Sequence, residues 1–85
     1  MKPNNRNQSY ILMNYETYNA TAGEDLHIVL MRNEKTGMYV TWECRNSDDF
    51  FWGHYFNSFV EAKLDYHKRL AENYERRLDR EETWN

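Results

Sequence analysis

The 85-residue sequence contains few residues that break or cross-link a chain: three glycines, one proline and one cysteine. This scarcity of Gly and Pro, with 16 % aromatic residues, excludes the composition of a disordered chain and predicts one folded domain. The single Cys44 excludes an internal disulfide framework and a zinc site built from several cysteines. The sequence also lacks a signal-peptide pattern and any run near the ~20 apolar residues of a membrane span. We therefore expect a cytoplasmic protein.

A basic stripe is also missing from the sheet-forming part of the chain. The net charge is −3, and the excess of acids lies between Glu43 and His67, where the aromatic residues are densest. Proteins that bind nucleic acids carry clustered Lys and Arg that neutralise phosphates. The charge pattern therefore argues against nucleic acid as the partner.

Strand patterns fill the middle of the chain. Residues 1–9 are polar and are expected to form a flexible tail. Alternating apolar residues between turn residues predict strands over 10–18, 26–32, 38–45 and 50–56, although the first of these also suits a short helix. Asn33 to Gly37 is typical of a hairpin, because Asn begins a type I turn and Gly accepts a positive φ. Gly53 indicates a bulge or a close backbone approach.

The last third of the sequence predicts one long helix over residues 59–81, with residues 83–85 frayed. Ser58-Phe59-Val60-Glu61 is a capping box. About 22 helical residues span ~33 Å and a seven-residue strand ~23 Å, so the last two turns are expected to extend beyond the sheet. The stripe expected to face the sheet follows three- and four-residue steps and is widened by Phe59, Lys63 and Leu70: Val60, Leu64, His67, Ala71, Tyr74 and Leu78.

These patterns together predict a single α+β domain over residues 10–82. Its architecture is expected to be a three- to four-stranded antiparallel β-meander packed against one long C-terminal α-helix.

No motif predicts catalysis, a metal or a cofactor. His27, His54 and His67 lack the spacing of zinc motifs, and the three glycines are isolated, so no phosphate-binding loop is formed. Cys44 lies on an apolar strand face and is interpreted as a core residue. The segment that contains Asp48 and Asp49 is interpreted as a turn. We expect a protein that is not an enzyme.

Six aromatic residues lie between Phe50 and Phe59, and the alternation of strand faces divides them. The expected seam beneath the helix comprises Phe50, Trp52, Phe56 and Phe59. The opposite, open sheet face is expected to carry a protein-binding surface, made of Tyr39, Glu43, Asp48, Asp49, Phe51, Tyr55, Glu61 and Asp65. The helix end is expected to offer a second docking surface, made of Tyr74, Arg76, Arg77, Arg80 and Trp84.

In size, mild acidity and layout, the chain resembles small accessory proteins of bacteriophages and other mobile elements, of which anti-CRISPR proteins are the prominent kind. The resemblance implies an inhibitor, acting as a monomer or as a homodimer, that occupies the nucleic-acid or guide-binding surface of a nuclease effector or another bacterial defence protein. The acids between Glu43 and Asp65 would then take the place of phosphates against a basic groove. Two alternatives stay open: a nucleic-acid-binding regulator that uses the Arg-rich helix end, and a self-associating structural protein.

Overall fold

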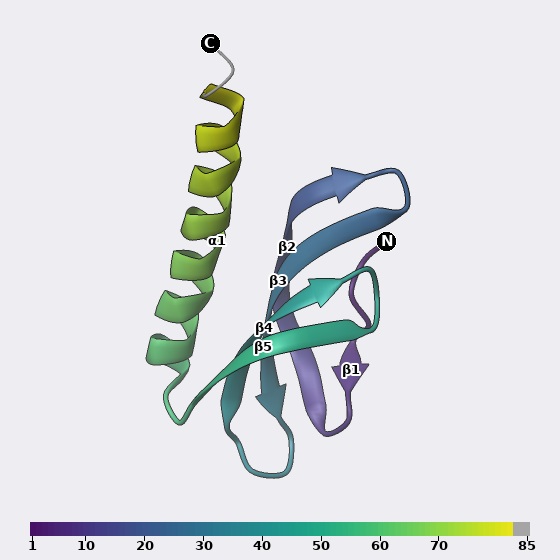
Figure 1. Ribbon diagram of the computed structural model, residues 1–85. Helices are drawn as coiled ribbons and strands as arrows, with labels where there is room; N and C mark the ends of the chain where they lie inside the picture. The colour runs from purple at the N-terminus through teal and green to yellow at the C-terminus, as the bar shows by residue number, and fades with distance from the viewer. Residues whose placement is uncertain (83–85) are drawn as a thin grey trace.

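The computed structural model describes the backbone of residues 1–82 and the side chains of residues 1–76 (Figure 1). A five-stranded antiparallel sheet is followed by one helix, with the strands side by side in chain order. This confirms the α+β class and the meander. The elements are β1 (Arg6–Asn7), β2 (Tyr10–Thr21), β3 (Glu24–Asn33), β4 (Tyr39–Arg45), β5 (Asp49–Phe56) and α1 (Phe59–Glu82).

The number of strands corrects the expectation of three or four. The additional strand, β1, lies in residues 1–9, where we expected a tail, and it pairs with the start of β2. The same segment reaches across to the turn between β4 and β5, where the Asn4 amide donates to the Ser47 carbonyl at 2.7 Å, and Pro3 is buried. Residues 10–18, which also suited a helix, belong to strand β2.

The local turn signals are confirmed. The Asn33 side chain accepts from the amides of Lys35 and Thr36 at 2.9 and 3.0 Å, and Gly37 has a φ of 76°. At the start of α1, the Ser58 hydroxyl accepts from the Glu61 amide at 3.3 Å, which is the expected N-cap contact.

The sheet is curled, so one of its faces encloses a core of its own. Tyr10 of β2 lies 5.0 Å from Trp42 and 6.4 Å from Tyr55 of β5, centroid to centroid, although β3 and β4 separate these strands in the sheet. We call the buried side chains of this face the inner core: Val29, Met31, Val40, Trp42 and Cys44. The expected open sheet face is therefore corrected: the curl buries most of it, and Tyr55 on the edge strand β5 stays 55 % exposed.

The opposite face packs against α1 and forms a second core (Figure 1). Its buried residues are Ile28 and Leu30 from β3 with Ala62, Tyr66 and Leu70 from α1. The stripe expected to face the sheet is wrong over its first part: Val60 and Leu64 are each 65 % exposed, and His67 and Ala71 are also exposed. Leu70 and Tyr74 do meet the sheet, and the side chain of Leu78 lies outside the described residues.

The physical reason for this rotation of the helix lies in β4. Because its apolar side chains fill the inner core, its polar residues Thr41 and Glu43 point at α1 and are buried there. The helix meets them with Asp65 and Arg69, which bond to Thr41, rather than with its most apolar stripe.

The division of the aromatic residues is also corrected. Phe50 packs on the inner core and Trp52 is 68 % exposed, so neither lies beneath the helix; Phe56 does. Phe59 contacts Tyr39 at 5.6 Å between ring centroids but is 38 % exposed.

Of the aromatic residues expected on the open face, only one lies on the side away from the helix. Tyr55 contacts Trp42 there, at 6.1 Å between ring centroids, whereas Tyr39 packs on the helix side and Phe51 lies opposite Glu43. The polar side of β4 thus faces the helix and its apolar side faces away, which is the reverse of the expectation.

Candidate functional site

A hollow of about 240 Å³ opens between α1 and the four long strands. We call it the Trp52 hollow and define it by the residues whose chemistry is used below: Tyr18, Glu43, Arg45, Phe51, Trp52 and Arg76. Its wall is aromatic, its floor holds a buried carboxylate and two arginines belong to its lining. Every long element of the fold contributes at least one lining residue.

A β-bulge in β5 builds the aromatic wall. Thr41 pairs with His54 and Glu43 with Phe51, so two residues, Trp52 and Gly53, oppose the single Trp42. Position 53 requires glycine, since a Cβ there would lie 2.5 Å from Nε1 of Trp42. In a regular strand neighbouring side chains point to opposite faces. Here the bulge places both neighbouring rings in the hollow, with centroids 5.1 Å apart for Phe51 and Trp52.

Trp52 is held in an unfavourable backbone conformation. Its φ is 54°, in the left-handed region that bulky residues rarely occupy. The indole is nevertheless 68 % exposed, so burial of the ring offsets little of this cost.

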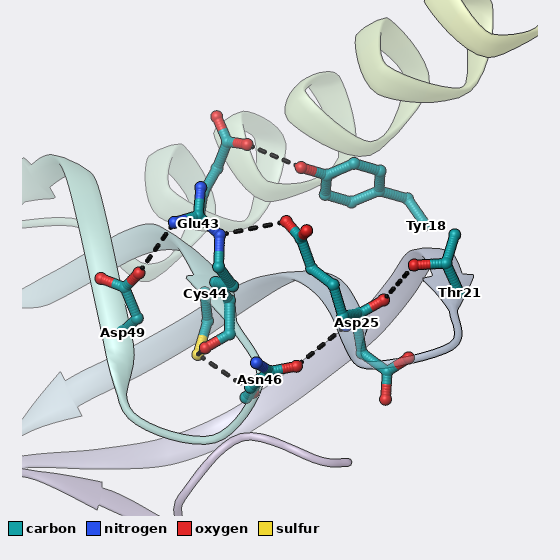
Figure 2. A network of polar contacts seen from close by, with 9 residues as sticks. Tyr18, Thr21, Asp25, Glu43, Cys44, Asn46 and Asp49 are labelled. Atoms are coloured by element: carbon teal, nitrogen blue, oxygen red, sulfur yellow. Dashed lines mark hydrogen bonds and ion pairs between the residues drawn. The ribbon is translucent and has the colours of Figure 1, made fainter.

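Glu43 forms the floor of the hollow. Its Oε1 accepts from the Tyr18 hydroxyl at 2.8 Å, a contact visible in Figure 2, and its Oε2 lies 3.5 Å from Nη2 of Arg69. Burial and this hydrogen bond raise the pKa of the Tyr18 hydroxyl, which therefore stays protonated and keeps donating.

Arg45 supplies part of the wall but is already engaged. Its Nε donates to Glu24 at 3.1 Å and its Nη1 to Asp49 at 3.3 Å, while its guanidinium lies 5.4 Å from the centroid of Phe51. Arg76 differs, because within the described side chains no ion pair joins it to a carboxylate. Among the described side chains of the hollow, Arg76 is therefore the cation that remains able to pair with a carboxylate of a partner.

A chain of polar contacts continues from the floor along the seam between α1 and the sheet. Arg69 donates to both the carbonyl and the hydroxyl of Thr41 at 3.1 Å, and that hydroxyl donates to Asp65 at 2.6 Å. His54 Nδ1 lies 2.9 Å from the same Asp65 oxygen. Within residues 1–76 no group of three or more His, Cys, Asp or Glu side chains is arranged to hold a metal.

The acids expected to form one partner-binding surface are dispersed. Glu43 and Asp65 are turned into the seam and paired there, and Asp49 is paired with Arg45. Asp48 is exposed in the turn before β5, and Glu61 is exposed in the first turn of α1. This arrangement lacks the continuous acidic surface that a phosphate-like mechanism needs.

The expected second docking surface is described only in part. Tyr74 bonds back to β2, donating to Glu16 Oε2 at 3.1 Å, and Arg76 lies in the Trp52 hollow. The side chains of Arg77, Arg80 and Trp84 lie outside the described residues.

Sequence reasoning missed the hollow although one signal for it was present. Gly53 indicated a bulge, and a bulge reverses the facing of every residue on one side of it. Applying that reversal would have placed Phe51 on the helix side. Tyr18 and Arg69 carried no such signal, because their roles depend on contacts between distant segments.

Comparison with family models, with curated proteins and with solved structures finds no match for this chain. Within the described residues, α1 is too polar to cross a membrane.

Proposed function

We propose that this protein is a non-catalytic protein-binding module whose contact surface centres on Trp52. The observation that carries the proposal is a tryptophan that is both strained and exposed, with a φ of 54° and 68 % of its surface in water. A left-handed conformation costs a bulky residue on the order of 1–2 kcal/mol. Strain of this kind is concentrated at binding and active sites, where the position of the side chain matters more than stability.

The neighbours of Trp52 support the same reading. Trp, Tyr and Arg are the residues that dominate the energy of protein interfaces, and the hollow brings Trp52 together with Tyr18 and Arg76. The aromatic wall suits an apolar or aromatic side chain of the partner. Arg76 suits a carboxylate beside it, because within the described residues it has no acid of its own.

The inhibitor role implied by the resemblance to anti-CRISPR proteins is the setting that we propose for this binding. The chain would then block a nuclease effector or another bacterial defence protein by occupying its surface. In this proposal the chain binds its partner through the Trp52 hollow and not through acids that take the place of phosphates, because Glu43 and Asp65 are paired inside the domain.

The test compares two exposed aromatic residues of the same strand. Affinity capture from the native host identifies the partner, and calorimetry then measures its Kd for the wild type, Trp52→Asn and Tyr55→Ala. Asn tolerates positive φ, so Trp52→Asn should unfold at the same or a slightly higher denaturant concentration. We expect it to weaken binding about 100-fold, as loss of a central interface residue does. Tyr55, 55 % exposed on the other side of the sheet, is the control and should bind normally.

Two outcomes contradict the proposal. If Trp52→Asn binds as the wild type does while Tyr55→Ala loses the partner, the contact surface lies on the opposite side of the sheet. If Trp52→Asn instead lowers the free energy of unfolding by more than about 2 kcal/mol, the indole has a structural role.

A further inference from the structure

The side of α1 that faces away from the sheet carries its own apolar stripe. Val60, Leu64, His67 and Ala71 follow steps of four, three and four residues, and all four are exposed. We call them the outer stripe. At 100° per residue the outer stripe is centred about 130° around the helix from Ala62, Tyr66 and Leu70, which contact the sheet. Figure 1 shows no described element covering that side of α1.

The spacing of the outer stripe is that of a helix that pairs with another helix. Alternating steps of three and four residues keep side chains on one seam, as the a and d positions of a coiled coil do. Val60 and Leu64, each 65 % exposed, add nothing to the core of the single chain. A helix that packs on one sheet of a monomer needs an apolar surface only on the side that faces the sheet, whereas α1 has a second apolar stripe.

We propose that two copies of this chain pair through the outer stripe, with their α1 helices antiparallel about a two-fold axis. In the register centred between Asp65 and Tyr66, Val60 faces Ala71 of the second copy and Leu64 faces its His67. The two-fold axis repeats each contact, so one self-complementary stripe completes the interface. The Trp52 hollow lies on the sheet side of α1 and takes no part, so this inference stands independently of the proposed function.

The charges beside the stripe select this orientation. Glu61 and Lys68 lie on the same flank, seven residues apart. In the antiparallel register Glu61 of each copy lies beside Lys68 of the other, which gives two attractive pairs. In a parallel pair, the equivalent flanking contact brings Lys63 of one copy beside Lys68 of the other, and like charges repel. The charge pattern therefore favours antiparallel over parallel pairing.

The contact is short, which limits its strength. Residues 60–71 make about three helical turns. Stable interfaces bury about 1,200–2,000 Å² in total, more than a three-turn helix pair provides. We expect a reversible dimer with a Kd on the order of 100 µM.

The first test is sedimentation of the wild-type protein from about 5 to about 500 µM, where we expect the weight-average mass to rise from one chain toward two. Leu64→Glu should remain a monomer throughout. Because Leu64 is 65 % exposed, this variant should melt at the wild-type temperature when both are monomeric. Met13→Glu, which changes another exposed apolar residue, 46 % exposed on β2, is the matched control and should still dimerise.

The second test addresses the charges and the orientation. Glu61→Lys and Lys68→Glu should each weaken the dimer about tenfold, and the double variant should restore it. For orientation, Val60→Cys and Ala71→Cys chains are mixed under oxidising conditions. Antiparallel pairing predicts a disulfide between the two different chains, whereas Val60→Cys chains that link to each other indicate parallel pairing. The native Cys44 is fully buried and should not interfere.

Three results would overturn the inference. These are a wild-type protein that stays monomeric at the highest concentration, a dimer that survives Leu64→Glu, and preferential linkage of Val60→Cys chains to each other. None of them bears on partner binding by Trp52, which the calorimetry measures separately.

Discussion

The two faces of the sheet are stabilised in different ways. The inner core is apolar, with Val29, Met31 and Val40 fully buried and packed around Trp42. The face beneath α1 combines apolar packing with a chain of buried polar contacts that runs through Thr41, Glu43 and Arg69. A sheet that curls can bury its most apolar face without a second layer. The helix then covers the more polar face. The buried polar groups of the helix and of this face must therefore be satisfied by hydrogen bonds to one another.

The difference predicts different roles for the two faces. Apolar packing such as that of the inner core stabilises the fold roughly in proportion to the area it removes from water. A buried ion pair gives little net stability, because desolvation of both ions offsets their attraction. The Glu43 and Arg69 pair is directional, however, and we expect it to fix how α1 is rotated and placed on the sheet, which in turn shapes the Trp52 hollow.

The largest expected effect comes from removing one half of that pair. Glu43→Ala leaves the guanidinium of Arg69 buried without its carboxylate and should lower the free energy of unfolding by about 3–5 kcal/mol. The double variant Glu43→Leu/Arg69→Met replaces both ions with apolar groups and should differ from the wild type by only about 1 kcal/mol. Urea denaturation measures both.

The matched control for the inner face is Trp42→Ala, which should lower the free energy of unfolding by about 3–5 kcal/mol. We expect no second substitution at a neighbouring apolar position to recover the stability that Trp42→Ala loses. If the double variant at Glu43 and Arg69 were as unstable as Glu43→Ala, the polar seam would contribute to stability itself and the contrast between the faces would fail.

The bulge at Gly53 is expected to be the next most sensitive position, because there a residue of β5 lies against Trp42 of the inner core. Gly53→Ala puts a methyl group 2.5 Å from Nε1 and 2.9 Å from Cδ1 of Trp42, so the indole must move within a packed core. We expect a loss of about 2–3 kcal/mol. Gly23→Ala is the control: it has a positive φ of 88° but no atom within 4 Å, so its cost reflects the backbone alone.

A double-mutant cycle separates crowding from other effects at Gly53. Trp42→Phe replaces the crowded indole with a smaller ring. In that background Gly53→Ala should lower the free energy of unfolding by about 1 kcal/mol less than it does in the wild type, which is a typical coupling energy between residues in contact. Additive costs would show that the glycine is needed for its backbone and not for the space beside Trp42.

The sequence predicted those features that depend on neighbouring residues. The Asn33 to Gly37 hairpin, the cap at Ser58 and the α+β class follow from local turn chemistry and periodicity, and all are confirmed. Gly53 also indicated the bulge correctly. A glycine within a strand marks a position where a Cβ would collide with a neighbouring atom, whichever residue that neighbour belongs to.

The features that the sequence did not predict depend on the curl. Nothing local in β4 says which of its faces meets the helix, and the apolar face was assigned to it because helices usually cover apolar surface. The curl reverses that assignment and, with it, the side of α1 that meets the sheet. The same error made Val60 and Leu64 look like core residues, although they are exposed, and it hid the hollow formed by Phe51 and Trp52.

The smallest expected effect is a pH dependence confined to the inner face. His27 is 1 % exposed beside the inner core; its Nδ1 lies 2.7 Å from the Thr17 hydroxyl, and its Nε2 is buried without a hydrogen-bond partner within the described residues. Burial lowers the pKa of His27. The unfolded chain therefore takes up a proton near pH ~6.5 while the folded protein does not. Stability should be complete above that pH and fall as the pH drops toward the folded pKa.

This dependence can be measured without disturbing the helix side. Urea denaturation between about pH 7.5 and 5 should show the free energy of unfolding falling as the pH drops, with a slope of at most ~1.4 kcal/mol per pH unit. His27→Leu, which removes the titrating ring from the inner face, should flatten that slope. His67→Leu is the control, since His67 is exposed on α1, and it should keep the wild-type slope. If both variants kept the wild-type slope, the pH dependence would arise from groups outside the inner face, and the two faces would not differ in this respect.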